Sequence, residues 1–448
     1  MKGHHIDGIS SRSHFVASEV TRVPKEWGEE QWIVNKEYCG KKLILKKNRR
    51  CSMHSHKKKD EVFYLQSGKV LLEMSGKKYT LLPGDFVHVK PNAPHRFTGL
   101  QDSEIIEFST THDEEDSYRT EFSGHSDPKR FERQSAIIHS FKNLSVLVLG
   151  DVMVDRYISG RIDRISPEAP VPVIHAVSER DVLGGAANSA ANMRAFGARV
   201  TLLGVVGNDG DGKRLKDMLK KQKIVASLLE DASRPTIVKE RITSLGGQQI
   251  ARIDREAVHS LSSSLEKRLI AILEKEIKKA DAVLISDYAK GLITPTLLRT
   301  VLKHAKKIPV VLDPKPHGHL TLAEMKGCTL ITPNMHEAYG LVRDHHASSD
   351  VIGSKLSKAT GGAVLLTRGA EGLDVFTHGK KILHLDSCAP QVVDVSGAGD
   401  TVAAIATMAL GGKSSLEDSA ELANTAASIV VQKRGTATLT AKELLDVL

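Results

Sequence analysis

The stretch Asp394-Val395-Ser396-Gly397-Ala398-Gly399-Asp400-Thr401 decides the fold class of the C-terminal part of this chain. It leads into residues 402–410, an alanine-rich segment with a helical pattern. Small residues before a helix let the backbone approach an anion, and the free N–H groups of the first turn then point at it. Asp400 would lie beside a bound phosphate, where it can take a proton from an attacking hydroxyl. For a bare G-x-G, an ordinary turn before a core helix is the alternative.

Composition permits two or three domains and favours anionic ligands. The chain has 448 residues, 40% of them hydrophobic, and a formal charge of +9. Lys and Arg are scattered along it, without an aromatic-interleaved basic block, so phosphorylated metabolites are favoured over nucleic acid. The four cysteines form no C-x-x-C pair, and there is no signal-peptide segment or apolar run of about 18 residues. We therefore expect a cytoplasmic protein without a membrane partner.

The chain changes character between residues 112 and 142. Before this region, short alternating segments separated by Gly, Pro and Asn predict an all-β barrel. After it, apolar strands alternate with helical patterns, for example over residues 264–280 and 296–307, which predicts a doubly wound α/β domain. We predict a poorly ordered lead-in over residues 1–28, a barrel over 29–122, a linker over 123–142 and the α/β domain over 143–448.

Polar residues follow five predicted buried strands of the α/β domain. They are Asp151, Asp287, Asp313, Asn334 and Arg368. Ligands of open α/β sheets bind at the carboxyl ends of the strands, so these residues indicate a polar active-site rim. Residues 157–176 and 236–253 break the alternation and predict short inserted β segments. A lid made of such segments would exclude water from a reacting phosphoryl group.

The motif D-V-S-G-A-G-D-T closely resembles the signature of the PfkB/ribokinase superfamily of sugar kinases. From residue 144 onward the chain resembles the D-glycero-D-manno-heptose-7-phosphate kinases of that superfamily, on the motifs at residues 150–157, 164–173, 184–188 and 286–291. The resemblance implies ATP- and Mg²⁺-dependent phosphorylation of the anomeric hydroxyl, giving a heptose 1,7-bisphosphate. It also implies a ribokinase-like sheet with a small β lid that doubles as the contact of a homodimer. Another sugar or sugar phosphate is the alternative substrate.

The resemblance also assigns site residues. Asp400 matches the catalytic base, and Gly397, Ala398 and Gly399 match the anion hole. Asn334 and Glu337 match an N-x-x-E element that organises magnesium through water, with a helix N-cap and first-turn acid as the alternative. The positions that match sugar contacts are Asp151, Asp155, Gly184, Gly185 and Asn188. Lys290, Arg164 and Arg241 are candidates for the sugar's phosphate, with solvated surface charge as the alternative. The positions on the ATP side are Thr367, Arg368, Gly369, Gly372 and Asn424.

The N-terminal part carries the spacing of a metal site. His54 and His56 would face the same side of a strand, because side chains alternate. Glu61 and His95 complete a set of three histidines and one carboxylate, which suits iron, manganese, zinc, nickel or cobalt. A structural role for any single histidine is the alternative, since the chain has twenty. The joint spacing resembles the cupin superfamily over residues 32–108. Asn48 stands where the first cupin motif begins with Gly, and Gly99 where the second ends with Asn.

Within the cupins, residues 94–96 and 107–118 resemble sugar-phosphate isomerase-type members. This implies aldose–ketose isomerisation, in which the metal polarises the substrate oxygens. The candidates for the proton-shuttling base are His88, Lys90 and Glu73, whereas Lys57, Lys58 and Lys59 would form a phosphate-attracting or solvated loop. Fusion to a kinase would suit consecutive steps of one sequence. The alternative is a non-catalytic cupin that senses a sugar and regulates the kinase.

Overall fold

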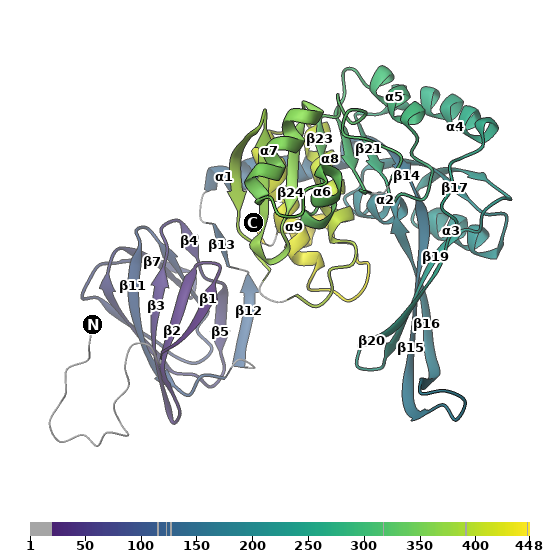
Figure 1. Ribbon diagram of the computed structural model, residues 1–448. Helices are drawn as coiled ribbons and strands as arrows, with labels where there is room; N and C mark the ends of the chain where they lie inside the picture. Colours follow the sequence, from purple (N-terminus) through teal and green to yellow (C-terminus); the bar gives the residue numbers. More distant parts are fainter. Residues whose placement is uncertain are drawn as a thin grey trace. The chain divides into compact units, whose positions relative to one another are not determined.

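The computed structural model describes residues 20–113, 116–121, 123–125, 128–316, 318–389, 392–445 and 447–448. The chain divides into two compact units, residues 1–133 with 445–448 and residues 134–444, and the division after Arg133 lies within helix α1 (Pro128–Ser140; Figure 1). Most of the expected lead-in, residues 1–19, lies outside the described residues, as do residues 114, 115, 126 and 127. Among the described residues, no helix combines the length and the hydrophobicity of a membrane span.

The N-terminal unit consists of two antiparallel sheets. The six strands of the first lie in the order β1 (Thr21–Lys25), β2 (Gly28–Asn35), β3 (Tyr38–Leu45), β11 (Ser103–Thr110), β6 (Glu61–Ser67) and β9 (Phe86–Val89). The second runs β12 (Ser117–Glu121), β5 (Met53–His56), β10 (His95–Gly99), β4 (Arg49–Arg50) and β13 (Gly124–His125), and β10 also pairs with β7 (Val70–Met74), which pairs with β8 (Lys77–Leu81). Alternating apolar residues of both sheets fill one core, including Leu45, Phe63, Leu72 and Phe97. The all-β barrel prediction is confirmed.

The expected boundaries of this unit need adjustment. Strand β1 pairs with β2 along its whole length, so regular structure begins at Thr21 rather than after the predicted lead-in. The expected linker contains helix α1, because residues 129–139 include apolar side chains at helical spacing, among them buried Ile138.

The C-terminal unit is built on a nine-stranded sheet. Its order is β18 (Val225–Glu230), β17 (Arg199–Val206), β14 (Ser145–Gly150), β21 (Ala282–Ser286), β22 (Val310–Asp313), β23 (Leu330–Ile331), β24 (Ala363–Thr367), β25 (Leu373–Thr377) and β26 (Lys380–Leu385). The pairs from β18 to β24 are parallel, and the last two are antiparallel. The described helices of this unit are α2 (Ala186–Ala195), α3 (Gly210–Lys221), α4 (Ser263–Glu276), α5 (Pro295–His304), α6 (Met335–Val342), α7 (Ser349–Thr360), α8 (Ala398–Gly411), α9 (Leu416–Val430) and α10 (Ala441–Leu445).

The order of these strands places the site. The chain runs outward from β14 through β17 to β18, then returns to the other side of β14 at β21 and runs outward again. Ligands of such sheets bind at the carboxyl ends beside this reversal. Helices α4, α5, α6 and α7 share one hydrophobic core with one face of the sheet, and α2 and α8 contact β21 and each other. The central strands are therefore buried on both faces, which explains their continuous apolar runs.

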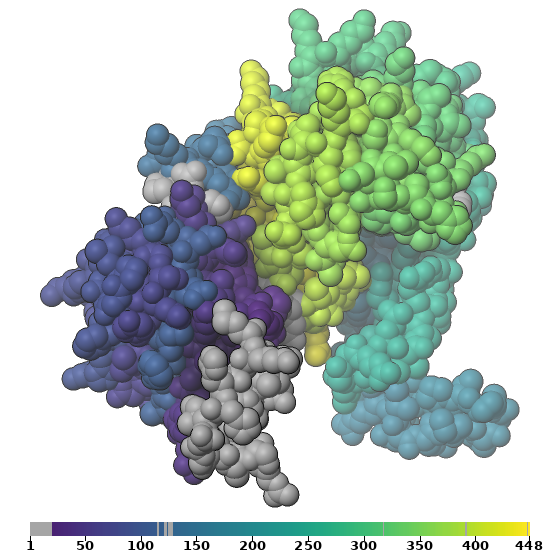
Figure 2. Space-filling model, turned by 60° about the vertical axis from the view of Figure 1, so that its left-hand side comes forward, coloured from purple at the N-terminus to yellow at the C-terminus, as the bar shows by residue number. Residues whose placement is uncertain are grey.

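A separate four-stranded sheet forms the predicted lid. Its order is β16 (Pro172–Gly185), β15 (Val152–Ile165), β19 (Ile237–Ser244) and β20 (Gln249–Arg255). Strand β15 starts one residue after β14 ends, so the lid begins earlier than the predicted segment at residue 157. The ends of the β15–β16 hairpin and of β20 project from the α/β body as an arm, blue and teal in Figure 2.

Candidate active site and metal centre

Asp400 lies in the first turn of α8 and is 3% exposed. Its Oδ2 accepts a hydrogen bond from Asn188 Nδ2 (2.8 Å), and its Oδ1 accepts one from the Tyr288 hydroxyl (2.8 Å). Burial raises the pKa of Asp400 to about 6, against the opposing effect of these hydrogen bonds and of the Lys315 charge. The carboxylate is thus ionised and oriented at neutral pH, as a general base requires.

The three small residues before Asp400 start helix α8. Gly397 is its N-cap with φ +80°, and a Cβ there would lie 2.8 Å from Asn188 Nδ2, so only glycine fits. A Cβ on Gly399 would meet nothing within 4 Å, which leaves open space beside the helix start. The N–H of Ala398 donates to the Val395 carbonyl (3.2 Å), so the Gly399 and Asp400 amides are the best placed for an anion.

Three further carboxyl groups lie at the strand ends near this turn. Asp151 follows β14 and accepts the backbone N–H groups of Tyr288 (2.9 Å) and Lys290 (3.2 Å), so it fixes the loop after β21. Asp287 has an Oδ2 that is buried without a hydrogen-bond partner in the described part of the chain. Burial raises the pKa of Asp151, and it raises those of Asp287 and Asp313 to about 7. Such clusters of perturbed carboxyls are typical of active sites.

The predicted sugar contacts come together at the root of the lid. Asp155 lies within β15 and binds Arg241 Nη1 of β19 (2.5 Å), so Arg241 is committed to a carboxylate. A Cβ on Gly184 would lie 2.4 Å from Asp155 Oδ2, and one on Gly185 2.5 Å from the Asp151 carbonyl oxygen. The two glycines therefore allow β16 to pass close to both acids. Asn188 follows in α2, where its amide holds Asp400.

The candidate cations for a sugar phosphate differ in their surroundings. Lys290 pairs with Glu256 (2.6 Å), and Arg164 is exposed near the tip of the hairpin, away from the strand ends. Lys239 of β19 is half-buried, and its Nζ lies 5.8 Å from the centroid of the Tyr288 ring. No carboxylate lies within ion-pair distance of Lys239 among the described residues. Burial lowers its pKa, as expected for a cation without a close counter-ion.

Asn334 and Glu337 form a complete capping box at the start of α6. The Glu337 N–H donates to Asn334 Oδ1 (2.9 Å), and the Asn334 N–H donates to Glu337 Oε2 (2.8 Å). The other oxygen of Glu337 accepts from Lys315 Nζ, which also lies 3.8 Å from Asp313 Oδ2. The geometry therefore matches the alternative interpretation, in which Asn334 is a helix N-cap and Glu337 is a first-turn acid. A magnesium role requires water-mediated contact or displacement of Lys315.

The predicted ATP-side residues form a turn between β24 and β25. Arg368 binds Asp374 (3.0 Å) and Glu371, which fixes its guanidinium within the turn. Gly372 has φ +88°, and a Cβ there would lie 1.9 Å from the Leu385 carbonyl oxygen, so glycine is required. Thr367 ends β24 and bridges to Asn334, and Gly369 starts the short helix that follows it. The Asn424 amide donates to the Asp386 carbonyl oxygen (2.9 Å), which ties α9 to the segment after β26.

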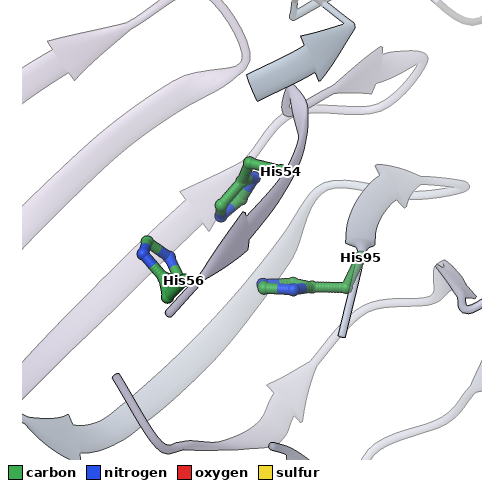
Figure 3. Close-up of side chains that lie close together, drawn as sticks. All are labelled: His54, His56 and His95. Atoms are coloured by element: carbon green, nitrogen blue, oxygen red, sulfur yellow. The ribbon is translucent and has the colours of Figure 1, made fainter. Parts of the chain in front are cut away.

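In the N-terminal unit, three imidazoles point toward one another: His54 and His56 from β5, and His95 from β10 (Figure 3). One ligand nitrogen from each ring lies within 4.8 Å of the others. Each Nδ1 is within hydrogen-bond distance of a backbone carbonyl oxygen: 2.9 Å for His54, 2.9 Å for His56 and 3.0 Å for His95. With Nδ1–H donating, each Nε2 keeps a lone pair for a metal. Burial lowers all three pKa values, to about 3 for His54 and about 4 for His95, so the rings are neutral.

Glu61 of β6 completes the set. Its Oε2 lies 3.4 Å from His95 Nε2, and its Oε1 lies 3.7 Å from His56 Nε2. Glu61 Oε2 and His95 Nε2 are buried without a hydrogen-bond partner in the described residues. Two unpartnered acceptors at this distance require a shared cation or a proton between them. The four residues therefore fit a divalent transition metal.

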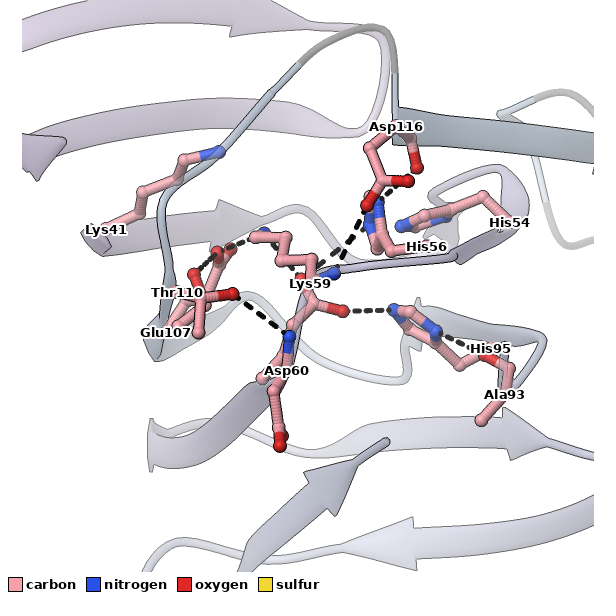
Figure 4. Close-up of polar contacts among 12 residues, drawn as sticks. Lys41, His54, His56, Lys59, Asp60, Ala93, His95, Glu107, Thr110 and Asp116 are labelled. Atoms are coloured by element: carbon pink, nitrogen blue, oxygen red, sulfur yellow. Dashed lines mark hydrogen bonds and ion pairs between the residues drawn. The ribbon is translucent and has the colours of Figure 1, made fainter. Parts of the chain in front are cut away.

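The neighbouring basic loop is not uniformly solvated. Lys57 and Lys58 are exposed, whereas Lys59 is 4% exposed, with Nζ 2.5 Å from Glu61 Oε1 and 2.6 Å from Glu107 Oε1 (Figure 4). The expectation of a solvated loop is wrong for Lys59, because the loop turns it into the barrel. Lys90 is exposed, His88 pairs with Asp60 (2.5 Å) and Glu73 pairs with Arg96 (2.6 Å). These contacts occupy both His88 and Glu73.

The two residues that depart from the cupin pattern, Asn48 and Gly99, are hydrogen-bonded to each other. Asn48 adopts φ +59°, the left-handed conformation that glycine usually provides and asparagine tolerates. Its N–H donates to the Gly99 carbonyl oxygen at 2.8 Å. A Cβ on Gly99 would lie 2.3 Å from the Lys46 carbonyl oxygen, so glycine is needed there. Both residues therefore suit the backbone of this loop.

Four residues of these sites had no role, or a different one, in the sequence analysis. Tyr288 and Lys315 follow predicted strand ends, which is a signal that they face the site. Lys239 lies within a predicted lid segment, but nothing in the sequence separates it from the neighbouring charges. Lys59 lies two residues before Glu61, and only the folded barrel shows that it is buried.

Models of known protein families match both the N-terminal and the C-terminal part of the chain. The family model described as "pfkB family carbohydrate kinase" matches residues 143–443, and the model described as "Cupin domain" matches residues 42–108. Bifunctional protein HldE of Azorhizobium caulinodans is 44% identical over 306 residues, and that of Caulobacter vibrioides is 43% identical over 313 residues. These regions cover 67% and 68% of this chain. The chain spans only 63% of the length of either relative.

Solved structures establish the fold of the C-terminal unit. Ribokinase of Arabidopsis thaliana, solved with ribose and ATP, gives a TM-score of 0.53 at 23% identity and covers 67% of this chain and 98% of its own. Phosphofructokinase-2 of Escherichia coli, solved with potassium, gives 0.55 at 17% identity, covering 68% and 98%. The family description, the two relatives and the fold together show that this chain belongs to the pfkB family of carbohydrate kinases and carries a cupin domain in its N-terminal part.

Proposed function

We propose that the kinase domain transfers the γ-phosphoryl group of ATP to the anomeric hydroxyl of D-glycero-D-manno-heptose 7-phosphate. One observation carries the proposal: Tyr288 links Asp400 to Lys239, which has no carboxylate within ion-pair distance in the described part of the chain. Its hydroxyl donates to Asp400, and its ring lies below Lys239 of the lid. A sugar with its reacting hydroxyl at Asp400 would then present a distal phosphate to the cations of the lid. The motif resemblance at residues 150–157 and 164–173 favours a heptose.

In the proposed mechanism, Asp400 accepts the proton of the anomeric hydroxyl as that oxygen attacks phosphorus. Asn188 and Tyr288 hold the carboxylate in place, so little reorganisation accompanies the transfer. The N–H groups at the start of α8 meet the charge on the transferred phosphoryl, and Gly399 leaves the space for it. Asp155 would accept hydrogen bonds from sugar hydroxyls. The turn of residues 367–372 would support the nucleotide.

Asn334 and Glu337 would hold magnesium through water. Bound magnesium neutralises charge on the phosphate oxygens. Lys315 lies between Glu337 and Asp313, and its ammonium would offset charge on a phosphoryl group bound beside them.

Glu337→Gln tests this assignment without breaking α6. Gln retains the capping box, because its amide oxygen still accepts the Asn334 N–H. The loss of charge should raise the Mg²⁺ concentration for half-maximal rate about tenfold, which corresponds to about 1.4 kcal/mol. Initial rates in a Mg²⁺ titration measure this, with Glu324→Gln on the protein surface as the matched control. An unchanged Mg²⁺ dependence would remove Glu337 from the metal's surroundings.

The pH profile should report Asp400. Because a base acts when deprotonated, kcat should be full well above the Asp400 pKa of about 6 and fall about tenfold per pH unit below it. Substrate phosphate, with a second pKa of about 6, titrates in the same range. Tyr288→Phe separates the two, because it removes a hydrogen bond that lowers the Asp400 pKa. The acid limb of the Tyr288→Phe variant should lie at higher pH than that of the wild-type chain. An unshifted limb would mean that a group other than Asp400 titrates there.

The position of the new phosphate tests the proposed reaction. The product formed from mannoheptose 7-phosphate should show a second ³¹P resonance coupled to the anomeric proton. A resonance coupled to any other sugar proton would mean that a different hydroxyl reacts. Another sugar or sugar phosphate remains the competing substrate for the same mechanism.

The lid also favours a homodimer. Aliphatic side chains along its strands and turns are exposed: Ile162, Ile165, Val171, Val177, Leu245 and Ile253. Exposed apolar residues are typical of association surfaces, and pairing with the lid of a second copy would cover these side chains. Light scattering on the purified chain distinguishes the outcomes: a mass of two chains supports the proposal, and a mass of one chain contradicts it.

For the cupin domain we propose a divalent transition metal bound by His54, His56, Glu61 and His95, and isomerisation of a sugar phosphate at that metal. The alternative is a sensor that binds a sugar and regulates the kinase. Ketose–aldose exchange, followed by NMR on the full chain carrying Asp400→Asn, with and without added Mn²⁺, separates the two. Metal-dependent exchange supports the isomerase. No exchange, together with wild-type kinase rates that respond to the ketose, supports the sensor.

A further inference from the structure

We propose that Lys59 is a positioning residue for the cupin metal: it holds Oε1 of Glu61 so that Oε2 alone is presented as a ligand. The inference rests on the metal site proposed above. It concerns how the chain prepares its only carboxylate ligand, and it makes that ligand monodentate.

The contacts of Glu61 divide between its two oxygens. Oε1 lies 2.5 Å from Lys59 Nζ, whereas Oε2 is buried, lacks a hydrogen-bond partner within the described residues and lies 3.4 Å from His95 Nε2. A carboxylate with one oxygen tied to an ammonium cannot chelate symmetrically. The free oxygen is the one beside His95, whereas the oxygen tied to Lys59 lies 3.7 Å from His56 Nε2.

Lys59 is itself held in place. Glu107 of β11 binds its Nζ at 2.6 Å and also accepts the Ser109 hydroxyl at 2.9 Å. The backbone N–H of Lys59 donates to Asp116 Oδ2 (3.2 Å), which fixes the loop before β6. Lysine is almost never this buried unless it is paired, and three buried charges are costly to keep. Groups that orient metal ligands repay such a cost, because they set ligand direction and affinity.

A competing explanation of Lys59 predicts that its removal strengthens metal binding instead of weakening it. If Lys59 instead competes with a metal for Glu61, its charge opposes the metal, and its removal should tighten binding. The decisive variant is the double substitution Lys59→Met with Glu107→Gln, which removes one charge of each sign from the interior. Lys58→Met, at an exposed neighbour, is the matched control. Lys59→Gln, which keeps a donor near Oε1, is the second variant should the double substitution unfold the barrel.

The experiment is a Co²⁺ titration of the full chain after chelator treatment, read by visible absorption and by competition with a chelator. The double variant should lose about 10–100-fold in Co²⁺ affinity and show an altered absorption spectrum, with a smaller loss for Lys59→Gln. Glu61→Gln should lose at least as much. Wild-type affinity and spectrum in the double variant, or tighter binding, overturn the inference. Failure of the wild-type chain to bind Co²⁺ refutes the metal site itself, which is a distinguishable result.

Discussion

Asp400→Asn should lower kcat for sugar phosphorylation by about 10²–10⁴-fold, the range expected for loss of a general base. The amide keeps the size of the carboxylate, and its single oxygen can still accept one of the two hydrogen bonds that Asn188 and Tyr288 donate to Asp400, but it cannot take a proton. KM for both substrates should change little, because the substitution leaves the binding groups in place. A coupled ATP-consumption assay on both proteins measures this.

Two control measurements test whether the loss of activity comes from the Asp400 carboxylate itself. Glu417→Gln makes the same chemical change in the first turn of α9, where the side chain is exposed, and should leave kcat unchanged. Thermal unfolding should show Asp400→Asn at least as stable as the wild-type chain, since a buried carboxylate with a raised pKa costs stability when ionised. Activity within a few-fold of wild type would mean that another group accepts the proton.

Lys239→Met should lower kcat/KM for a sugar phosphate about 10–100-fold, because a charge-assisted hydrogen bond to a half-buried group contributes about 1.5–3 kcal/mol. The effect should fall mainly on KM, since the phosphate is remote from the reacting hydroxyl. Lys290→Met should cost less, because its charge is already matched by Glu256.

The substrate provides the control for this second prediction. With the corresponding sugar lacking the phosphate, Lys239→Met and the wild-type chain should have similar kcat/KM values. An equal loss on both substrates would make Lys239 a structural residue of the lid. If kcat/KM falls for neither substrate, the sugar's phosphate binds elsewhere on the protein.

The kinase fold was largely predictable, because its signals are local. Strands β14, β21, β22 and β24 end within one residue of Asp151, Asp287, Asp313 and Arg368, which mark their predicted ends, since buried parallel strands are continuous apolar runs. The polar residues at their carboxyl ends converge for a topological reason, which sequence order already implies. The helix start at Gly397 was predictable from glycine and a first-turn acid.

The parts that sequence missed depend on long-range packing. Lys59 and Lys58 are adjacent and chemically identical, yet one is buried against Glu107, 48 residues away, and the other is exposed. Lys239 and Arg241 lie on one strand, and Asp155 on its neighbour pairs with only the second. Asn188 matched a sugar contact, and the structure shows in addition that its amide donates to Asp400. Each distinction depends on pairing between distant strands or helices, which no local pattern encodes.

The most direct test of the central claim is ATP consumption by the wild-type chain against a panel of sugars and sugar phosphates, including mannoheptose 7-phosphate, hexose 6-phosphates, ribose and fructose. The account predicts that mannoheptose 7-phosphate has the highest kcat/KM of the panel, at least about tenfold above the others, which corresponds to about 1.4 kcal/mol. Preference for an unphosphorylated pentose or hexose would contradict it.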